Sequence, residues 1–179
     1  MDKIMEVIKK RRSVRVYKDK PLSREIIDSL LEAAKYAPTA RNMQELEYKV
    51  VTDRDRIKEI SDKIIAKVKK EEPQIQLSPR AQASLFYGAP LLMILTGPKD
   101  NNWIYSDAAL AVENIMLYAT SIGLGTCFIG WARMIDRNEE LQKELHVSND
   151  RKIAAAVICG YPGEEPAERE KKMNAEFFH

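Results

Sequence analysis

The feature of this chain that most constrains its fold is a long apolar helix that lies between two apolar strands. The periodicity of residues 106–122 predicts a helix that is apolar on nearly every side, and Gly123 ends it. The runs 90–96 and 153–159 are short and continuously apolar, which is typical of strands buried on both faces. Because a small domain rarely buries a helix on all sides by itself, the pattern also predicts a partner subunit.

Weaker patterns along the rest of the chain predict further helices and one more strand. Asp2 is expected to cap a short helix with Ile4, Val7 and Ile8 on its apolar side. Apolar spacing and capping residues indicate further helices at 23–37, 55–70, 80–87 and 136–145, the last with Asp136 and Glu139 as its capping pair, and a strand at 48–52. The stretch 71–79 contains two prolines and indicates an excursion or lid. The charged tail 164–179 ends in two phenylalanines, which we expect to pack on another surface. A length of 179 residues predicts one domain, 1–179, that needs no disulfide or metal to fold.

A basic segment near the N-terminus, Arg11-Arg12-Ser13-Val14-Arg15, carries the first indication of a ligand. In an extended chain, alternation places Arg11, Ser13 and Arg15 on one face and turns Arg12 to the other. Like charges this close repel one another unless an anion lies among them, and guanidinium groups donate paired hydrogen bonds to phosphate oxygens. The segment therefore predicts a phosphate-bearing ligand; the alternative is a solvated basic edge.

The chain lacks the residue clusters that several other chemistries need. Its two histidines, His146 and His179, lie far apart in the sequence without neighbouring metal ligands, so neither a metal site nor a histidine-dependent hydrolase is expected. Cys127 and Cys159 lie in apolar surroundings, which favours free thiols in a reducing compartment over a disulfide scaffold. A chain that is poor in acid–base residues but able to hold a phosphate fits an enzyme whose cofactor carries the reactivity.

Charge and hydropathy exclude two classes of partner. The net charge is +2, and basic residues mostly alternate with acidic ones, so the sequence predicts no nucleic-acid surface. No apolar run approaches the roughly 18 residues of a membrane span, and the N-terminus lacks the apolar core of a signal peptide. We therefore expect a cytoplasmic protein without a membrane or nucleic-acid partner.

Four motifs, in order along the chain, resemble those of the FMN-dependent nitroreductase family. They are the basic segment Arg11–Arg15, the helix end and loop Ala33–Gln44, the segment Gly123–Gly130, and Gly160-Tyr161-Pro162 with basic residues after it. The resemblance covers essentially the whole chain. It has two departures: Glu45-Leu46 follows Gln44 where relatives commonly have Pro-Trp, and Lys171 stands at a tail position that is usually arginine.

The resemblance implies an α+β fold with a central mixed, mostly antiparallel sheet wrapped by helices. It also implies an intertwined homodimer with two FMN sites at its interface, where the loop up to Gln44 approaches the flavin from the other subunit. The residues that it assigns to FMN are Arg11, Arg12, Ser13, Arg15, Pro38, Thr39, Asn42, Gln44, Phe128, Ile129, Gly130 and Lys171. Within that set, Phe128, Ile129 and Gly130 are expected to act largely through backbone N–H groups.

The implied reaction is a two-step, ping-pong transfer in which the flavin carries the chemistry and no side chain is catalytic. NADH or NADPH gives a hydride to flavin N5 and leaves, and a small electron-poor acceptor such as a nitroaromatic or a quinone then takes the electrons. Two alternatives stay open: another FMN reaction on the same fold (dehalogenation, flavin cleavage or dehydrogenation), and a flavin-binding protein that is not an enzyme. Cys127 is expected to be packed rather than redox-active. The aromatic residues Phe86, Tyr87, Trp103 and Tyr105 fit a core or interface and a flavin pocket about equally well.

Overall fold

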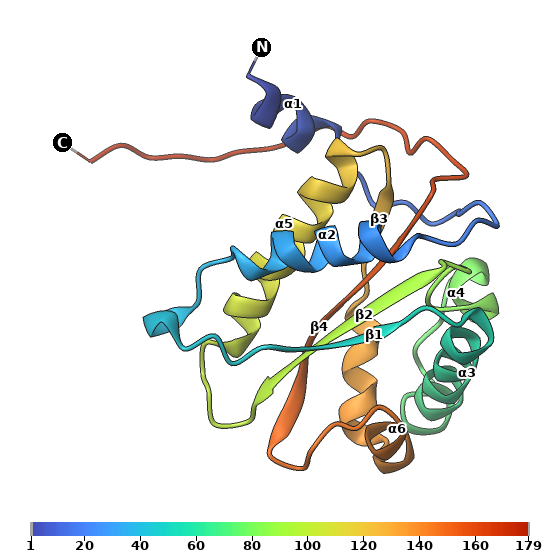
Figure 1. Cartoon of the computed structure of the whole chain (residues 1–179). Helices are drawn as coiled ribbons and strands as arrows, with labels where there is room; N and C mark the ends of the chain where they lie inside the picture. Colours follow the sequence, from blue (N-terminus) through green and yellow to red (C-terminus); the bar gives the residue numbers. More distant parts are fainter. Residues whose placement is uncertain (1, 179) are drawn as a thin grey trace.

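The apolar runs predicted as buried strands form the centre of a four-stranded sheet in the computed structural model, which describes residues 2–178 (Figure 1). The strands are β1 (Glu47–Val51), β2 (Leu91–Pro98), β3 (Gly125–Phe128) and β4 (Arg151–Gly160), and they lie in the order β1-β2-β4-β3. All three strand pairings are antiparallel, so the expectation of a mixed sheet was wrong. Among residues 2–178, parallel pairing occurs in a single bridge between Ser13 and Thr126, where the basic segment meets the sheet edge.

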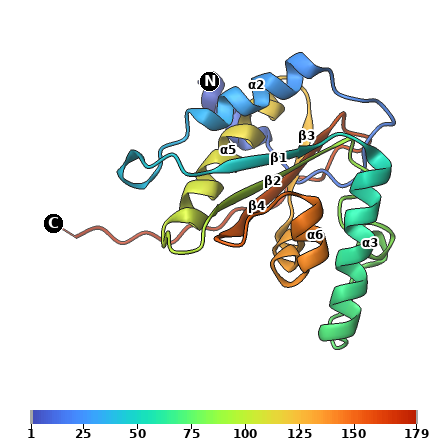
Figure 2. The same cartoon turned by 60° about the horizontal axis from the view of Figure 1, so that its bottom comes forward.

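Helices cover both faces of this sheet, as Figure 2 shows. The helices are α1 (Lys3–Lys10), α2 (Arg24–Lys35), α3 (Arg54–Glu71), α4 (Pro79–Ala83), α5 (Ile104–Ser121) and α6 (Glu139–Glu144), with 3-10 helices η1 (Ala40–Asn42) and η2 (Gly130–Arg137). Along β2, Leu91, Met93 and Leu95 pack with α2 and α5, whereas Leu92 and Ile94 pack with α3, α4 and η2. Because successive side chains of a strand point to opposite faces, one apolar strand supplies both cores.

Helix α5 is buried on one side and partly open on the other. Ala108, Ala111 and Ile115 are fully buried against the sheet and α2, whereas Leu110 is 46% exposed. Burial on all sides is therefore not achieved within one chain. The helix begins at Ile104, two residues before the predicted start. The turn that leads into it is held by a hydrogen bond from Trp103 N to Asn101 Oδ1.

Two predicted helix ends were wrong for local reasons. Asn138, not Asp136, caps α6, since the Asn138 side chain accepts a hydrogen bond from Leu141 N at 3.1 Å. The Asp136 carboxylate instead accepts from Ile153 N at 2.8 Å, because η2 runs alongside β4. The helix predicted at 80–87 ends at Ala83, since the chain becomes extended at the next residue and then takes positive φ at Tyr87.

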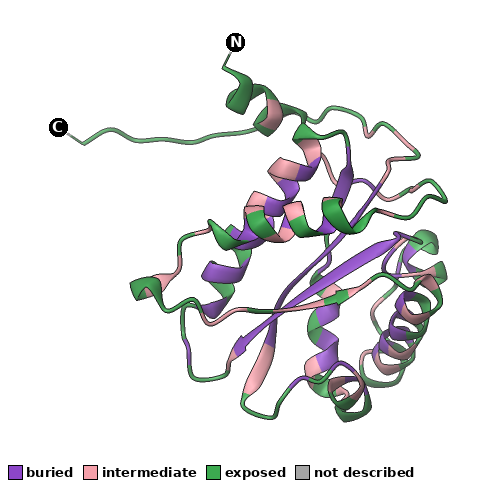
Figure 3. Ribbon diagram, viewed as in Figure 1, coloured by how far each residue is buried: buried purple, intermediate pink, exposed green. Residues whose placement is uncertain are grey.

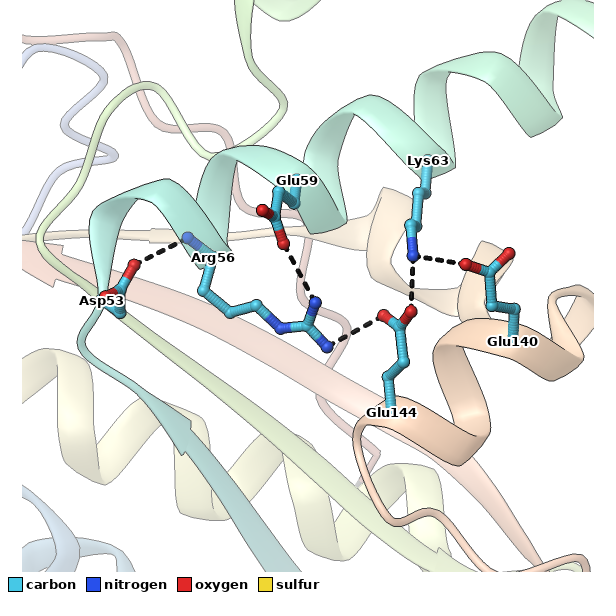
Figure 4. Close-up of polar contacts among 6 residues, drawn as sticks. All are labelled: Asp53, Arg56, Glu59, Lys63, Glu140 and Glu144. Carbon is cyan, nitrogen blue, oxygen red and sulfur yellow. Dashed lines mark hydrogen bonds and ion pairs between the residues drawn. The ribbon is translucent and has the colours of Figure 1, made fainter.

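Ion pairs between charged residues of α3 and α6 hold these two helices together (Figure 4). Arg56 donates to Glu59 at 3.0 Å and to Glu144 at 2.8 Å, and Lys63 donates to Glu140 and Glu144, each at 2.6 Å. The hydrogen bonds from Lys63 and Arg56 lower the pKa of Glu144 below its ordinary value. These charges therefore have partners in the fold and do not indicate a ligand site.

Apolar side chains at both ends of the chain have no cover within it. Helix α1 has no buried residue, and its Ile4, Met5 and Ile8 are exposed. The tail runs extended beyond β4, and its Phe177 and Phe178 are 83% and 89% exposed (Figures 1 and 3). Within the described residues, the surface on which the tail was expected to pack is therefore not part of the same chain.

The described residues form neither a cluster of metal ligands nor a helix that could span a membrane. Among residues 2–178, no three His, Cys, Asp or Glu side chains gather as metal ligands do, and His179 lies outside the described residues. None of the helices described is both long and apolar enough to cross a bilayer.

Candidate functional site

The basic segment lies against the edge strand β3, and a valine fixes it there. Val14 N donates to Thr126 O at 2.9 Å, and the Val14 side chain is 5% exposed. A Cβ built on Gly125 would lie 2.7–2.9 Å from three Val14 atoms, so only glycine allows this approach. Alternation thus holds at Val14, whereas Val16 is 36% exposed because the segment has left the sheet edge there.

A pocket of about 460 Å³ joins this segment to the end of β3. Its walls are Arg15, Leu85, Tyr87, Cys127, Phe128, Ile129, Gly130 and Trp131. Two of the motifs assigned to FMN, 11–15 and 128–130, therefore meet in one place. The Ile129 N–H donates to Ala156 O at 2.9 Å and serves the fold, so it is not free for a ligand as was predicted.

Arg15 brings a positive charge to this pocket without an ion-pair partner in the described part of the chain. Its guanidinium carbon lies 5.9 Å from the centre of the Tyr87 ring, and its backbone N donates to Glu164 Oε1 at 3.0 Å. Arg11, by contrast, lies 3.7 Å from a carboxylate oxygen of Glu113. A partly buried guanidinium that forms no ion pair with the described residues indicates a site for an anion.

The Cys127 thiol lines the same pocket, and its pKa responds both to burial and to polar groups nearby. Burial raises the pKa of this thiol, and Arg15, the Ser13 hydroxyl and Arg11 oppose that effect in decreasing order. Of the three side chains predicted to share a face, Arg15 has the largest of these opposing effects, and it also lines the pocket. Because the raised pKa keeps Cys127 a neutral thiol, a nucleophilic role is disfavoured, in agreement with the prediction of a packed residue. Burial likewise raises the pKa of Cys159 to about 12.

Two of the predicted FMN residues are placed elsewhere. The Arg12 guanidinium donates to the carbonyl oxygens of Lys9 and Arg11 and lies 3.4 Å from Glu168 Oε1, away from the pocket walls. Lys171 lies in the exposed tail, and among residues 2–178 no hydrogen bond or ion pair joins it to the basic segment. Of the predicted cationic residues, Arg15 lines this pocket, whereas Arg12 and Lys171 do not.

The loop from Pro38 to Gln44 forms a second, separate group of predicted residues. Its backbone takes positive φ at Arg41, Asn42 and Gln44, with values of 52°, 55° and 54°. Gln44 N donates to the Thr39 hydroxyl at 3.1 Å, and Gln44 Nε2 donates to Asn42 Oδ1 at 2.9 Å. Positive φ at three non-glycine residues is unfavourable, and such strain is concentrated at functional sites.

These two groups lie at opposite ends of α5 (Figure 1). The loop is attached to the first turn of α5, where Ala40 N donates to Asp107 Oδ1 at 3.0 Å. The basic segment pairs with Thr126, which follows the last turn of α5. At 1.5 Å per residue, these ends of the helix are roughly 21 Å apart. A single chain therefore does not bring the loop and the basic segment into one site.

The structure adds two pocket residues that the sequence did not indicate, Leu85 and Trp131, and it places Tyr87 in the pocket rather than in the core. Leu85 and Tyr87 come from the turn after α4, and Trp131 is the second residue of η2. An aromatic residue next to Gly130 was a usable signal for Trp131. For Tyr87 the sequence signal was weaker: a Tyr-Gly dipeptide, which is typical of a turn. The neighbouring Phe86 is fully buried in the core. Trp103 and Tyr105 lie away from this pocket.

Comparisons with known proteins agree over nearly the whole chain. The model of the nitroreductase family matches residues 8–161. A protein of Archaeoglobus fulgidus, provisionally named an NADH dehydrogenase/NAD(P)H nitroreductase, is 29% identical over 185 aligned positions that span 100% of this chain and 98% of the relative. The FMN reductase (NAD(P)H) of Bacillus subtilis is 26% identical over 180 positions, 94% of this chain and 70% of the relative.

A solved structure supports the same assignment. The crystal structure of a nitroreductase with bound FMN from Bacteroides fragilis has a TM-score of 0.85 and 28% identity, and it covers 100% of this chain and 98% of its own. The matched range of the family model includes the basic segment, the loop after α2 and the end of β3. With this α+β fold and these motifs in order, the chain belongs to the nitroreductase family.

Proposed function

We propose that this chain is an NAD(P)H-dependent flavin oxidoreductase that uses FMN to reduce small electron-poor acceptors such as nitroaromatics or quinones. The observation that carries the proposal is the Arg15 guanidinium, which lines a pocket beside Phe128 and Gly130 without a neutralising carboxylate among the described residues. The names and bound ligand of the relatives support FMN as the cofactor and NADH or NADPH as the donor. Residues 1–179 act as one cofactor-binding unit.

The residues present fit a phosphorylated, planar aromatic cofactor. Arg15 lines the pocket, and with Ser13 and Arg11 from the same segment it would hold the phosphate by charge-assisted hydrogen bonds. The aromatic side chains of Tyr87, Phe128 and Trp131 stand in the same pocket and would pack against a ring system while they exclude water. FMN would supply the hydride-accepting atom, so the chain's own residues need only bind, orient and shield it.

A homodimer would complete this site. The loop Pro38–Gln44 lies roughly 21 Å along α5 from the basic segment, so only a second copy can bring the loop to the pocket. The exposed apolar side chains of α1, of the outer face of α5 and of the tail offer the surface that such a partner would bury. The two free, buried thiols fit a reducing compartment, and we propose the cytoplasm.

The visible spectrum of the purified protein tests this function. We expect flavin absorption near 450 nm on the order of one FMN per chain, bleached by NADH or NADPH without oxygen and restored by a quinone or a nitroaromatic. A protein that binds FMN but is not reduced by either nicotinamide would be a flavin carrier rather than this enzyme. A protein that stays colourless after added FMN would contradict the cofactor assignment itself.

Truncation of the tail tests the dimer. The full chain of 20.5 kDa is expected to sediment as a species of twice that mass, and removal of residues 172–179 is expected to shift it toward the monomer at micromolar concentration. Phe177 and Phe178 contact little in their own chain, so monomer stability should not change. The full-length variant with both phenylalanines replaced by serine is the matched control and should dissociate similarly. A full-length monomer would contradict the proposal.

A further inference from the structure

A hydrogen-bonded chain of three residues attaches the far end of the Pro38–Gln44 loop to the turn that precedes α5. Glu45 Oε2 accepts from Asn101 Nδ2 at 2.8 Å, and Asn101 Oδ1 accepts from Trp103 N at 2.7 Å. Asn101 is 8% exposed, so both ends of its amide are committed inside the protein. With one end accepting and the other donating, only one orientation of this amide satisfies both bonds.

The main chain of Glu45 is fixed independently by the partly buried Arg151. Arg151 Nη2 donates to Glu45 O, and its other nitrogens bond to Thr96 and to the Glu47 carboxylate. The Arg151 side chain is 11% exposed. The main chain of Glu45 is therefore attached to β2 and β4 through Arg151. Its carboxylate contacts Asn101.

The other end of the loop is held from the same helix terminus. The Asp107 carboxylate, 4% exposed in the first turn of α5, accepts from Ala40 N at 3.0 Å. The strained residues Arg41, Asn42 and Gln44 thus lie between two attachments to one helix end. Since positive φ at non-glycine residues persists only where surrounding contacts impose it, these attachments maintain the loop conformation.

We propose that Glu45 and Asn101 form a polar latch that positions Asn42 and Gln44 for contact with the cofactor. Glu45 lies directly after this loop, so its hydrogen bond to Asn101 restrains the loop at the residue that follows Gln44. Glu45 and Asn101 are positioning residues, because neither side chain lines the pocket that contains Arg15. The consequence for the cofactor rests on the proposed function.

The experiment exchanges donor and acceptor across this one contact. In Asn101→Asp, two carboxylates face each other and the donor is lost, yet Oδ1 can still accept from Trp103 N. Glu45→Gln, added to Asn101→Asp, restores a donor from the opposite side. We expect Asn101→Asp to weaken FMN binding about tenfold, the loss of one charge-assisted hydrogen bond, and to speed amide hydrogen exchange over residues 40–45. The double variant should recover most of both losses.

Exchange and cofactor affinity are read separately, so failure of the latch and failure of the proposed function can be told apart. Recovery of slow exchange in the double variant supports the latch even if the wild-type protein were to take up no FMN, a result that would overturn only the proposed function. The latch is overturned if Asn101→Asp exchanges as the wild type does, or if the double variant is no better than the single one. It is also overturned if the loop loosens while FMN affinity and the spectrum of bound flavin stay unchanged. Thermal unfolding of all variants identifies a general loss of stability.

Discussion

Arg15→Ala is expected to leave the purified protein largely free of flavin. One or more charge-assisted hydrogen bonds to an anion, each worth about 1.5–3 kcal/mol, would be lost, which raises the dissociation constant of FMN roughly 10- to 150-fold. Arg15 is the residue of choice because its guanidinium lines the pocket, whereas Arg11 is partly neutralised by Glu113. Titration of the apoprotein with FMN, followed by quenching of flavin fluorescence, measures the change.

Arg12→Ala is the matched control in the same segment. The Arg12 guanidinium bonds to the carbonyls of Lys9 and Arg11 and does not line the pocket. We therefore expect a much smaller loss of FMN affinity, about threefold or less, because charges that interact through solvent contribute little. Equal losses in the two variants would mean that net charge, not the placement of Arg15, governs binding. Unchanged affinity in Arg15→Ala would contradict the assignment of the pocket to FMN.

Gly97→Ala is expected to destabilise the whole fold. A Cβ at this position of β2 would lie 2.1 Å from both Cγ1 and Cδ1 of Ile104, the first residue of α5. Ile104 is fully buried and β-branched, so it has no free rotamer to move into. Overpacking of this kind costs about 1–3 kcal/mol or more. Urea unfolding measures the loss, and Gly130→Ala, where no atom lies within 4 Å of the new Cβ, should change stability by less than about 0.5 kcal/mol.

A second substitution makes this prediction specific to one contact. Ile104→Ala alone should cost about 2–5 kcal/mol, because it leaves a cavity. Its Cβ, however, lies 3.5 Å from the position of the new Cβ at Gly97, an ordinary contact distance. The double variant should therefore be more stable than the sum of the two losses predicts, by at least about 1 kcal/mol. Additive losses would mean that Gly97→Ala acts through something other than Ile104.

The central strands and the long helix could be predicted because their signal is local. A strand between two layers of helices needs apolar residues on both faces, and 90–96 and 153–159 carry that pattern within one short window. Strand β3 was missed because its four residues have no such pattern. It is a strand because it pairs with β4, with Gly125 opposite Gly160.

The short-range capping rule failed at Asp136 for a related reason. Asp136 is a good helix cap by type, and Glu139 stands at the right spacing. The carboxylate nevertheless bonds to Ile153, seventeen residues away, because η2 packs along β4. A capping pattern describes which bonds a side chain can make locally, and it cannot register a competing partner that only folding brings near.

The sequence by itself determined the chemistry of the candidate site: a cluster of guanidinium groups, a polar loop after a helix and a segment bounded by Gly123 and Gly130, in an order that resembles one family. These are properties of residue types, and they hold whatever the chain conformation. Only the tertiary structure decided that Arg15 enters the pocket while Arg12 turns to Glu168, and that Asn101 holds Glu45. Those choices depend on distances between segments far apart in the sequence, and packing around α5 and the sheet sets them.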